Sequence, residues 1–214
     1  MDRRFWAWSM SDFPNCQLQG QVHGWIRLWA AGLWPFQTNQ EFFRQRILSV
    51  IRATGKFVNT DGSIDQVFKN ERSWAATAFL AHDLLQTARI AGDLNFQEIR
   101  REACCVAEPL IKFLQRTKES HGLVTNHIAC GAAAQLLWSE LTADSTSEGI
   151  AEKMLNAIMA TQSREGWFPE YVGPDPGYQT WALMYLADIE SRQPRLVEYY
   201  RLSQTVNFLA HFVA

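Results

Sequence analysis

The sequence predicts an all-α protein in which about four helical hairpins form two layers, an inner layer of Ala-rich helices and an outer layer of amphipathic ones. The first observation is a repeat. Along the 214 residues, a loop rich in Gly, Asn, Asp and aromatic residues runs four times into a helix of small apolar residues, at a spacing of about 52 residues. The second observation is that an ordinary amphipathic helix follows each small-residue helix. This repeat favours an open ring with the unusual loops at one end.

The four small-residue helices are expected to begin near Gly20, Arg72, Asn126 and Tyr178. Their apolar positions leave little room for a polar face, which indicates helices that are buried on most sides. The clearest runs of small residues are Ala75, Ala76, Ala78 and Ala81 in the second helix, and Ala129, Gly131, Ala132, Ala133 and Ala134 in the third. We therefore assign these helices to the inner layer.

The helices that alternate with them carry a one-sided apolar stripe, which is typical of an outer layer. The stripe positions are Phe43, Ile47, Val50 and Ile51 in one helix, and Ile99, Ala103, Val106, Leu110 and Phe113 in the next. Pro109 lies within the second stripe and is expected to kink that helix or to split it in two. The last stripe runs to Ala214 without a polar cap, whereas repeat arrays normally end in polar capping units. We therefore expect residues 1–214 to be a single domain that forms the N-terminal part of a longer protein.

The composition argues against several classes of function. The net charge of −2 gives no overall attraction to nucleic acid. No apolar run reaches the roughly 18 residues that a membrane span needs, and no segment suits a signal-peptide core, so we expect a cytoplasmic protein. The four cysteines show neither C-x-x-C nor paired metal-ligand spacing. Buried free thiols are therefore expected, with neither a metal site nor a cofactor.

Loops held by a rigid scaffold are the usual place for binding and catalysis. The first loop, residues 12–20, supplies amides that suit sugar hydroxyls, although a turn with an Asn cap would look the same. The second loop brings a carboxylate, an amide and a guanidinium to a helix start, in Asp61, Asn70, Glu71 and Arg72. A turn at Asp61 and a helix cap at Asn70 would explain part of this pattern without a site. An arginine in a first helical turn opposes the helix dipole, so Arg72 should have a carboxylate partner, either Glu71 or one on a substrate.

The third loop places Asn126 and His127 at the mouth of the third inner helix. His127 is a candidate acid, base or donor that neutralises a carboxylate, although a lone histidine is also a common structural residue. The fourth loop, residues 162–178, combines prolines, glycines, carboxylates and aromatics, which indicates a rigid, shaped surface. Its candidate residues are Trp167 and Phe168 for stacking on sugar faces, and Glu170, Tyr171, Asp175 and Tyr178 for acid, base and hydrogen-bonding roles. The alternative is a packed loop with Trp167 in the core.

Together these features resemble the α/α-toroid domains of heparinase-like polysaccharide lyases and of related uncharacterised bacterial toroid proteins. The resemblance covers nearly the whole chain and rests on the hairpin period, Asp61-Gly62-Ser63, Asn70-Glu71-Arg72-Ser73, Thr125-Asn126-His127, residues 166–171 and residues 175–178. It implies an incomplete toroid with a cleft across the loop end. In such a cleft, Asn or Arg neutralises a uronate carboxylate, His or Tyr acts as the base, and Tyr acts as the acid. The residues that suit these roles are Arg72, Asn126, His127, Tyr171 and Tyr178.

We therefore expect a carbohydrate-active protein that acts on, or binds, an acidic bacterial polysaccharide or oligosaccharide, by β-elimination if it is an enzyme. A glycoside hydrolase on the same scaffold would use two carboxylates, such as Asp61, Glu170 or Asp175. A toroid that binds glycan or protein without catalysis is another alternative, because aromatic loops bind sugars in either case. A terpenoid cyclase is disfavoured, because the sequence has no D-x-D-D run.

Overall fold

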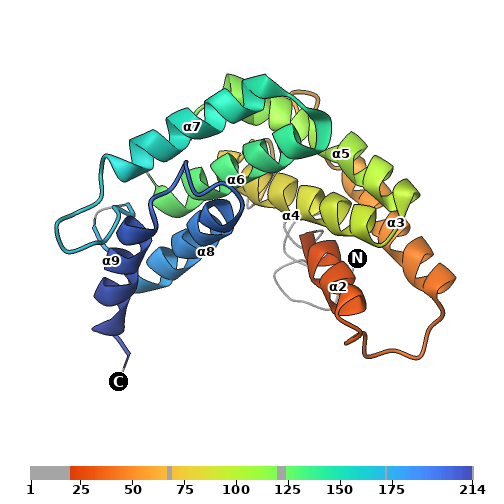
Figure 1. Cartoon of the computed structure of the whole chain (residues 1–214). Coiled ribbons are helices and arrows are strands. Elements are labelled where there is room, and N and C mark those ends of the chain that lie inside the picture. Colours follow the sequence, from red (N-terminus) through yellow and green to blue (C-terminus); the bar gives the residue numbers. More distant parts are fainter. Residues whose placement is uncertain (1–19, 67–68, 120–123, 172, 214) are drawn as a thin grey trace. The chain divides into compact units, whose positions relative to one another are not determined.

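The computed structural model describes residues 20–66, 69–119, 124–171 and 173–213 (Figure 1). The chain forms two compact units, residues 1–117 and residues 118–214. Within the described ranges the secondary structure is helical, and β pairing is limited to two isolated bridges, Ile64 with Ser73 and Glu170 with Gly173. The all-α prediction is confirmed. The incomplete ring of hairpins and the single domain stay predictions.

The described helices follow the predicted alternation. The first unit contains α2 (Gln21–Ala30), α3 (Gln40–Gly55), α4 (Trp74–Asp93) and α5 (Gln97–Arg116). The second unit contains α6 (Thr125–Thr142), α7 (Ser145–Met159), α8 (Pro176–Arg192) and α9 (Tyr199–Ala210). The small-residue helices α2, α4, α6 and α8 each begin within about two residues of the predicted position. Most side chains of α4 and the first two-thirds of α6 are buried as expected, whereas α2 buries only Val22 and Ile26.

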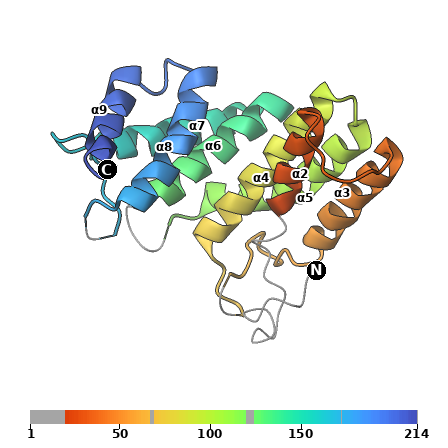
Figure 2. The ribbon, with the colours of Figure 1, turned by 90° about the horizontal axis from the view of Figure 1, so that it is seen from below.

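In the first unit, α4 and α5 form an antiparallel hairpin, and the two preceding helices pack against them (Figures 1 and 2). The inner helix α2 runs in the same direction as α4, because His23 near its start meets Asp83 and Ala31 at its end lies near Leu94. The outer helix α3 contacts α5, and the Arg52 guanidinium bridges the carboxylates of Glu98 and Glu102 at 2.8 and 3.0 Å. Inner helices therefore lie side by side, each backed by an outer helix.

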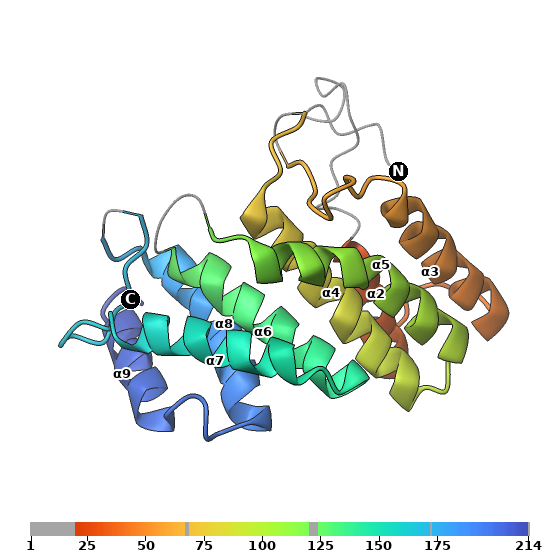
Figure 3. The same cartoon turned by 90° about the horizontal axis from the view of Figure 1, so that it is seen from above.

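The second unit repeats this arrangement. Helices α6 and α7 form the antiparallel hairpin, which Figure 3 shows as two ribbons lying along one another. Helix α8 lies along α6 in the same direction, because Glu170 just before α8 bonds Asn126 at the start of α6, and Arg192 at the end of α8 pairs with Glu140 near the end of α6. Parallel inner helices place the loops that precede α6 and α8 at the same end of this unit.

The same backbone turn occurs twice in the chain, about 104 residues or two repeat lengths apart. One copy lies in the second loop and the other in the fourth loop. In the second loop the Asn59 amide donates to the Ser63 carbonyl at 2.8 Å, and the Gly62 amide donates to the Asn59 carbonyl at 2.9 Å. In the fourth loop Ser163 and Trp167 make the first of these bonds at 2.8 Å, and Gly166 makes the second at 3.1 Å. The same backbone turn therefore precedes both α4 and α8.

Both turns need glycine at the same position. Gly62 has φ +87° and Gly166 has φ +96°, a region that residues with a Cβ rarely adopt. A Cβ on Gly62 would lie 2.2 Å from the Pro109 carbonyl oxygen, and one on Gly166 would lie 2.4 Å from the Gln204 carbonyl oxygen. Each turn is therefore pressed against the backbone of an outer helix, which fixes where the loop begins.

Other sequence expectations fare differently. Helix α5 is continuous from Gln97 to Arg116 with Pro109 inside it, so the helix is not split. Cys104, Cys105 and Cys130 are free, but only Cys130 among them is buried, and Cys105 is exposed. Cys16 and most of the first loop lie outside the described residues. None of the described helices has both the length and the apolar character that crossing a bilayer requires.

Candidate active site

A carboxylate–imidazole pair lies at the loop end of the second unit. His127, in the first turn of α6, has its Nδ1 2.8 Å from the Oε2 atom of Glu119. The Glu119 side chain is 3% exposed and that of His127 is 10% exposed, so the pair is shielded from water. A carboxylate only accepts hydrogen bonds, so Nδ1 donates to Glu119, and a neutral ring in this tautomer would have its lone pair on Nε2. This is the form of histidine that acts as a general base.

Two tyrosines extend the pair toward solvent. The Tyr171 ring meets the His127 ring edge to face at 6.2 Å, and the Tyr178 ring lies 5.7 Å from that of Tyr171. Tyr171 is 54% exposed. Its φ of 52° is a left-handed conformation that is costly for a residue with a side chain and tends to occur at functional sites.

The surroundings of Tyr171 favour its protonated form. Burial of the hydroxyl is the main cause that raises the pKa of Tyr171, and the nearby Tyr178, Glu119 and Glu170 raise it further. A phenol that keeps its proton can donate it to a departing oxygen, which is the part of a general acid. The cluster of Glu119, His127, Tyr171 and Tyr178 therefore combines a base and an acid.

Glu170 and Asn126 hold the fourth loop against α6. Glu170 is 3% exposed, and its two oxygens accept hydrogen bonds from the backbone amide and the Nδ2 of Asn126, both at 2.9 Å. The Thr125 hydroxyl donates to the Pro169 carbonyl at 2.7 Å. No side chain of its own caps α6, so the Glu170 carboxylate supplies the missing cap from the neighbouring loop. Burial raises the pKa of Glu170, although the Asn126 hydrogen bonds and His127 oppose this effect.

These contacts give two of the residues predicted for the site a structural role. Glu170 was a candidate for binding or acid–base chemistry, but both its oxygens are occupied by the start of α6. Asn126 was a candidate for neutralising a substrate carboxylate, but it is fully buried and its amide nitrogen serves Glu170 instead. Its Oδ1 atom has no hydrogen-bond partner among the described residues. Both residues therefore position the loop that carries Tyr171.

The other predicted residues of the fourth loop, Phe168, Asp175 and Trp167, lie in three different environments. Phe168 is 1% exposed, and its backbone amide and carbonyl are held by the Gln179 side chain at 2.8 and 2.6 Å. Its ring is therefore a core element rather than a surface for sugar stacking. Asp175 caps α8 through the Tyr178 amide at 2.9 Å. Trp167 is half-buried and donates from its indole nitrogen to Glu165 at 3.0 Å, so part of its ring faces solvent.

The second loop is organised around Asp65, which is not among the residues that the sequence predicts for a site. The Asp65 carboxylate accepts from the Asn59 side chain at 3.2 Å and from the backbone amides of Asn70 and Arg72 at 2.9 and 3.0 Å. Asn70 and Arg72 are both left-handed, with φ 65° and 54°. Ser73, not Asn70, caps α4 through the Ala76 amide.

Arg72 accordingly lies before the helix and not in its first turn. Its Nε is 3.5 Å from the Oδ2 of Asp61, while the side chain is 63% exposed. Its carboxylate partner is therefore Asp61 and not the predicted Glu71, which accepts a hydrogen bond from the Gln66 amide at 2.8 Å. Burial would raise the pKa of Asp61, but hydrogen bonds from Ser63 and the charge of Arg72 outweigh it, and the pKa is lowered. That Arg72 shares a cleft with residues of the second unit stays a prediction.

Glu119, the partner of His127, is also not among the site residues that the sequence predicts. The available signal was a carboxylate eight residues before His127 in the same connection, but that spacing is not a known motif.

No three His, Cys, Asp or Glu side chains are grouped to hold a metal ion in the part of the chain that the structure describes. No protein-family model matches the sequence, and no curated protein is significantly similar to it.

Proposed function

We propose that the loop end of the 118–214 unit binds an acidic polysaccharide or oligosaccharide and cleaves it by β-elimination. The observation that carries this proposal is the Glu119–His127 pair, with its 2.8 Å contact, beside the solvent-facing Tyr171. Two partly accessible aromatic rings, Tyr178 beside Tyr171 and Trp167 in the same loop, suit the apolar faces of sugar rings.

The chemistry needs one base and one acid. The Nε2 atom of His127 removes the proton from the sugar carbon next to the uronate carboxylate, and Glu119 stabilises the imidazolium that forms. The electron pair of that C–H bond becomes a carbon–carbon double bond as the bond to the leaving oxygen on the adjacent carbon breaks. Tyr171 gives its proton to that oxygen. The products are an unsaturated uronate at one new end and a reducing end, with the hydroxyl on the anomeric carbon, at the other.

Glycan binding without catalysis is the second candidate, and a specific contact favours it. The Asn126 amide, which was expected to neutralise the substrate carboxylate, is held by Glu170. Elimination needs such neutralisation, because negative charge develops beside the carboxylate. Hydrolysis is less well supported, because Glu170 is fully engaged and Asp175 serves as a helix cap.

A single incubation separates these functions. The chain is mixed with a panel of uronate polysaccharides, and near-ultraviolet absorbance is followed together with reducing ends. Elimination raises both signals, because it makes a double bond conjugated to the carboxylate. Hydrolysis raises reducing ends alone, and binding without cleavage is detected by titration with neither signal. If no glycan in the panel binds, the carbohydrate proposal is wrong.

Substitution of the base and the acid should abolish turnover and leave binding in place. His127→Gln and Tyr171→Phe are each expected to lower kcat by roughly 100-fold or more, with little change in KM, because they remove proton transfer and not sugar contacts. Glu119→Gln is expected to lower kcat by about tenfold, because it keeps a hydrogen-bond acceptor for the His127 ring but removes the charge that stabilises the imidazolium. Tyr199→Phe, on an exposed side chain of α9, is the matched control and should retain full activity. Unchanged kcat in both His127→Gln and Tyr171→Phe would remove these residues from the mechanism.

A further inference from the structure

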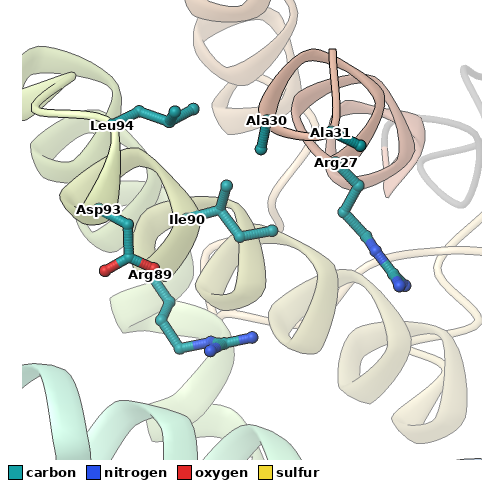
Figure 4. Close-up of a pocket in the computed structure, with 7 residues that line it drawn as sticks. All are labelled: Arg27, Ala30, Ala31, Arg89, Ile90, Asp93 and Leu94. Carbon is teal, nitrogen blue, oxygen red and sulfur yellow. The ribbon is translucent and has the colours of Figure 1, made fainter. Parts of the chain in front are cut away.

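A cavity lies in the first unit, between the C-terminal halves of α2 and α4 (Figure 4). Its volume is about 500 Å³, within the usual range for small-molecule pockets. One wall comes from α2, the other from α4, and the Ile90 side chain points across the gap toward α2. The lining residues are Arg27, Ala30, Ala31, Arg89, Ile90, Asp93 and Leu94. We propose that this cavity binds a small organic anion with one carboxylate and an apolar body.

The charged side chains of the cavity favour an anionic ligand. The lining includes two guanidinium groups, Arg27 from α2 and Arg89 from α4, and one carboxylate, Asp93. In Figure 4 both guanidinium groups lie on the same side of Ile90. Among the described residues no carboxylate pairs with Arg27. The side chains of the lining therefore carry one positive charge in excess, and a bound carboxylate would balance it.

Arg89 is held in place from behind. Its Nε and Nη2 both donate to the Gln86 Oε1, at 3.1 and 2.9 Å, which leaves the other guanidinium edge for a ligand. Gln86 is 5% exposed, and its Nε2 lies 3.5 Å from the Nε2 of His82. A guanidinium fixed in this way loses less conformational entropy when an anion binds.

The chain of polar groups continues into the core. Both His82 and His23 have their Nδ1 3.4 Å from the same Asp83 oxygen. Burial would raise the pKa of Asp83, but hydrogen bonds from His23 and His82 outweigh it, so the pKa is lowered. Polar side chains at successive turns of an otherwise apolar helix are costly unless they are paired. Here they form one network from α2 to Arg89, at the edge of the cavity.

The rest of the lining selects the kind of anion. Ala30, Ala31, Ile90 and Leu94 offer methyl and methylene groups, which suit an apolar body. The carboxylate of Asp93 and the C-terminal ends of α2 and α4 are both negative, so a dianion such as phosphate is disfavoured. A monocarboxylate with a short alkyl chain satisfies both parts of the cavity.

Octanoate is the probe for this proposal, titrated into the full chain and followed by calorimetry and by amide NMR shifts of Ala31 and Leu94. Saturable binding is expected, and Arg27→Gln and Arg89→Gln should each weaken it about tenfold. Arg101→Gln, an exposed arginine on α5, is the matched control and should leave the affinity unchanged. Circular dichroism of each variant checks that the helices persist.

Three results would overturn the proposal. The first is no saturable octanoate binding at millimolar concentration. The second is equal affinity in the wild-type chain and in both Arg27→Gln and Arg89→Gln, which would mean that the guanidinium groups are not used. The third is binding of methyl octanoate or inorganic phosphate at least as tight as that of octanoate, because one lacks the charge and the other lacks the apolar body.

Discussion

Replacing Gly166 with alanine is expected to lower the free energy of unfolding by about 3 kcal/mol. The new Cβ would meet the Gln204 carbonyl oxygen at 2.4 Å, and φ +96° is strained for any residue with a side chain. Relief would require the turn to move away from α9. That movement would break the hydrogen bonds that the Gly166 carbonyl accepts from Thr205 at 2.8 Å and from Gln162 at 3.0 Å. Chemical denaturation measures the loss.

The repeat makes the same prediction for the first unit, where Gly62→Ala should cost a similar amount because its Cβ would meet the Pro109 carbonyl oxygen. Gly24→Ala and Gly149→Ala are matched controls, since both sites are helical and open. Each control should raise stability by about 0.5–1 kcal/mol, because alanine favours a helix. If Gly62→Ala and Gly166→Ala were no more destabilising than these controls, the two turns would not depend on glycine.

Much of the helical pattern could be predicted because it follows from local sequence. Small-residue runs and apolar stripes have the period of a helix, and repeated hairpins place similar segments at regular intervals. The starts of α2, α4, α6 and α8 were within about two residues of their predicted positions for this reason. Residue type alone was a less reliable guide to the exact position of a helix cap. Asn70 is a favourable cap by type, yet the left-handed turns at Asn70 and Arg72 leave the cap to Ser73.

The candidate site was predicted only in part, because its contacts join residues far apart in the sequence. Histidine and tyrosine at helix mouths could be recognised by type, and the structure brings His127, Tyr171 and Tyr178 together. The pairing of Glu170 with Asn126 spans 44 residues, and no pattern in either segment reveals it. Composition likewise gave no reason to choose between Phe168 in the core and Phe168 on the surface. Burial decides such roles, and burial depends on packing.

Glu170→Ala is expected to lower the free energy of unfolding by about 3 kcal/mol, because it leaves buried donors of Asn126 unpaired and removes the cap of α6. Glu170→Gln should be close to neutral. Its carbonyl can accept from the Asn126 amide, and its NH₂ group can donate to the Asn126 Oδ1 once that side chain rotates, because this oxygen has no partner among the described residues. The comparison separates loss of hydrogen bonds from loss of charge.

The pH dependence of these variants tests the state of Glu170. Burial raises its pKa in the folded chain, so the folded form binds a proton more readily than the unfolded form does. The resulting stabilisation is fully present below the unfolded pKa and is lost as pH rises through the folded pKa. Glu170→Gln cannot titrate, so its stability relative to wild type should increase from pH 4 to pH 7.5 in denaturation experiments. A difference that is constant or that changes in the opposite direction would show that burial does not raise the pKa of Glu170 in the folded chain.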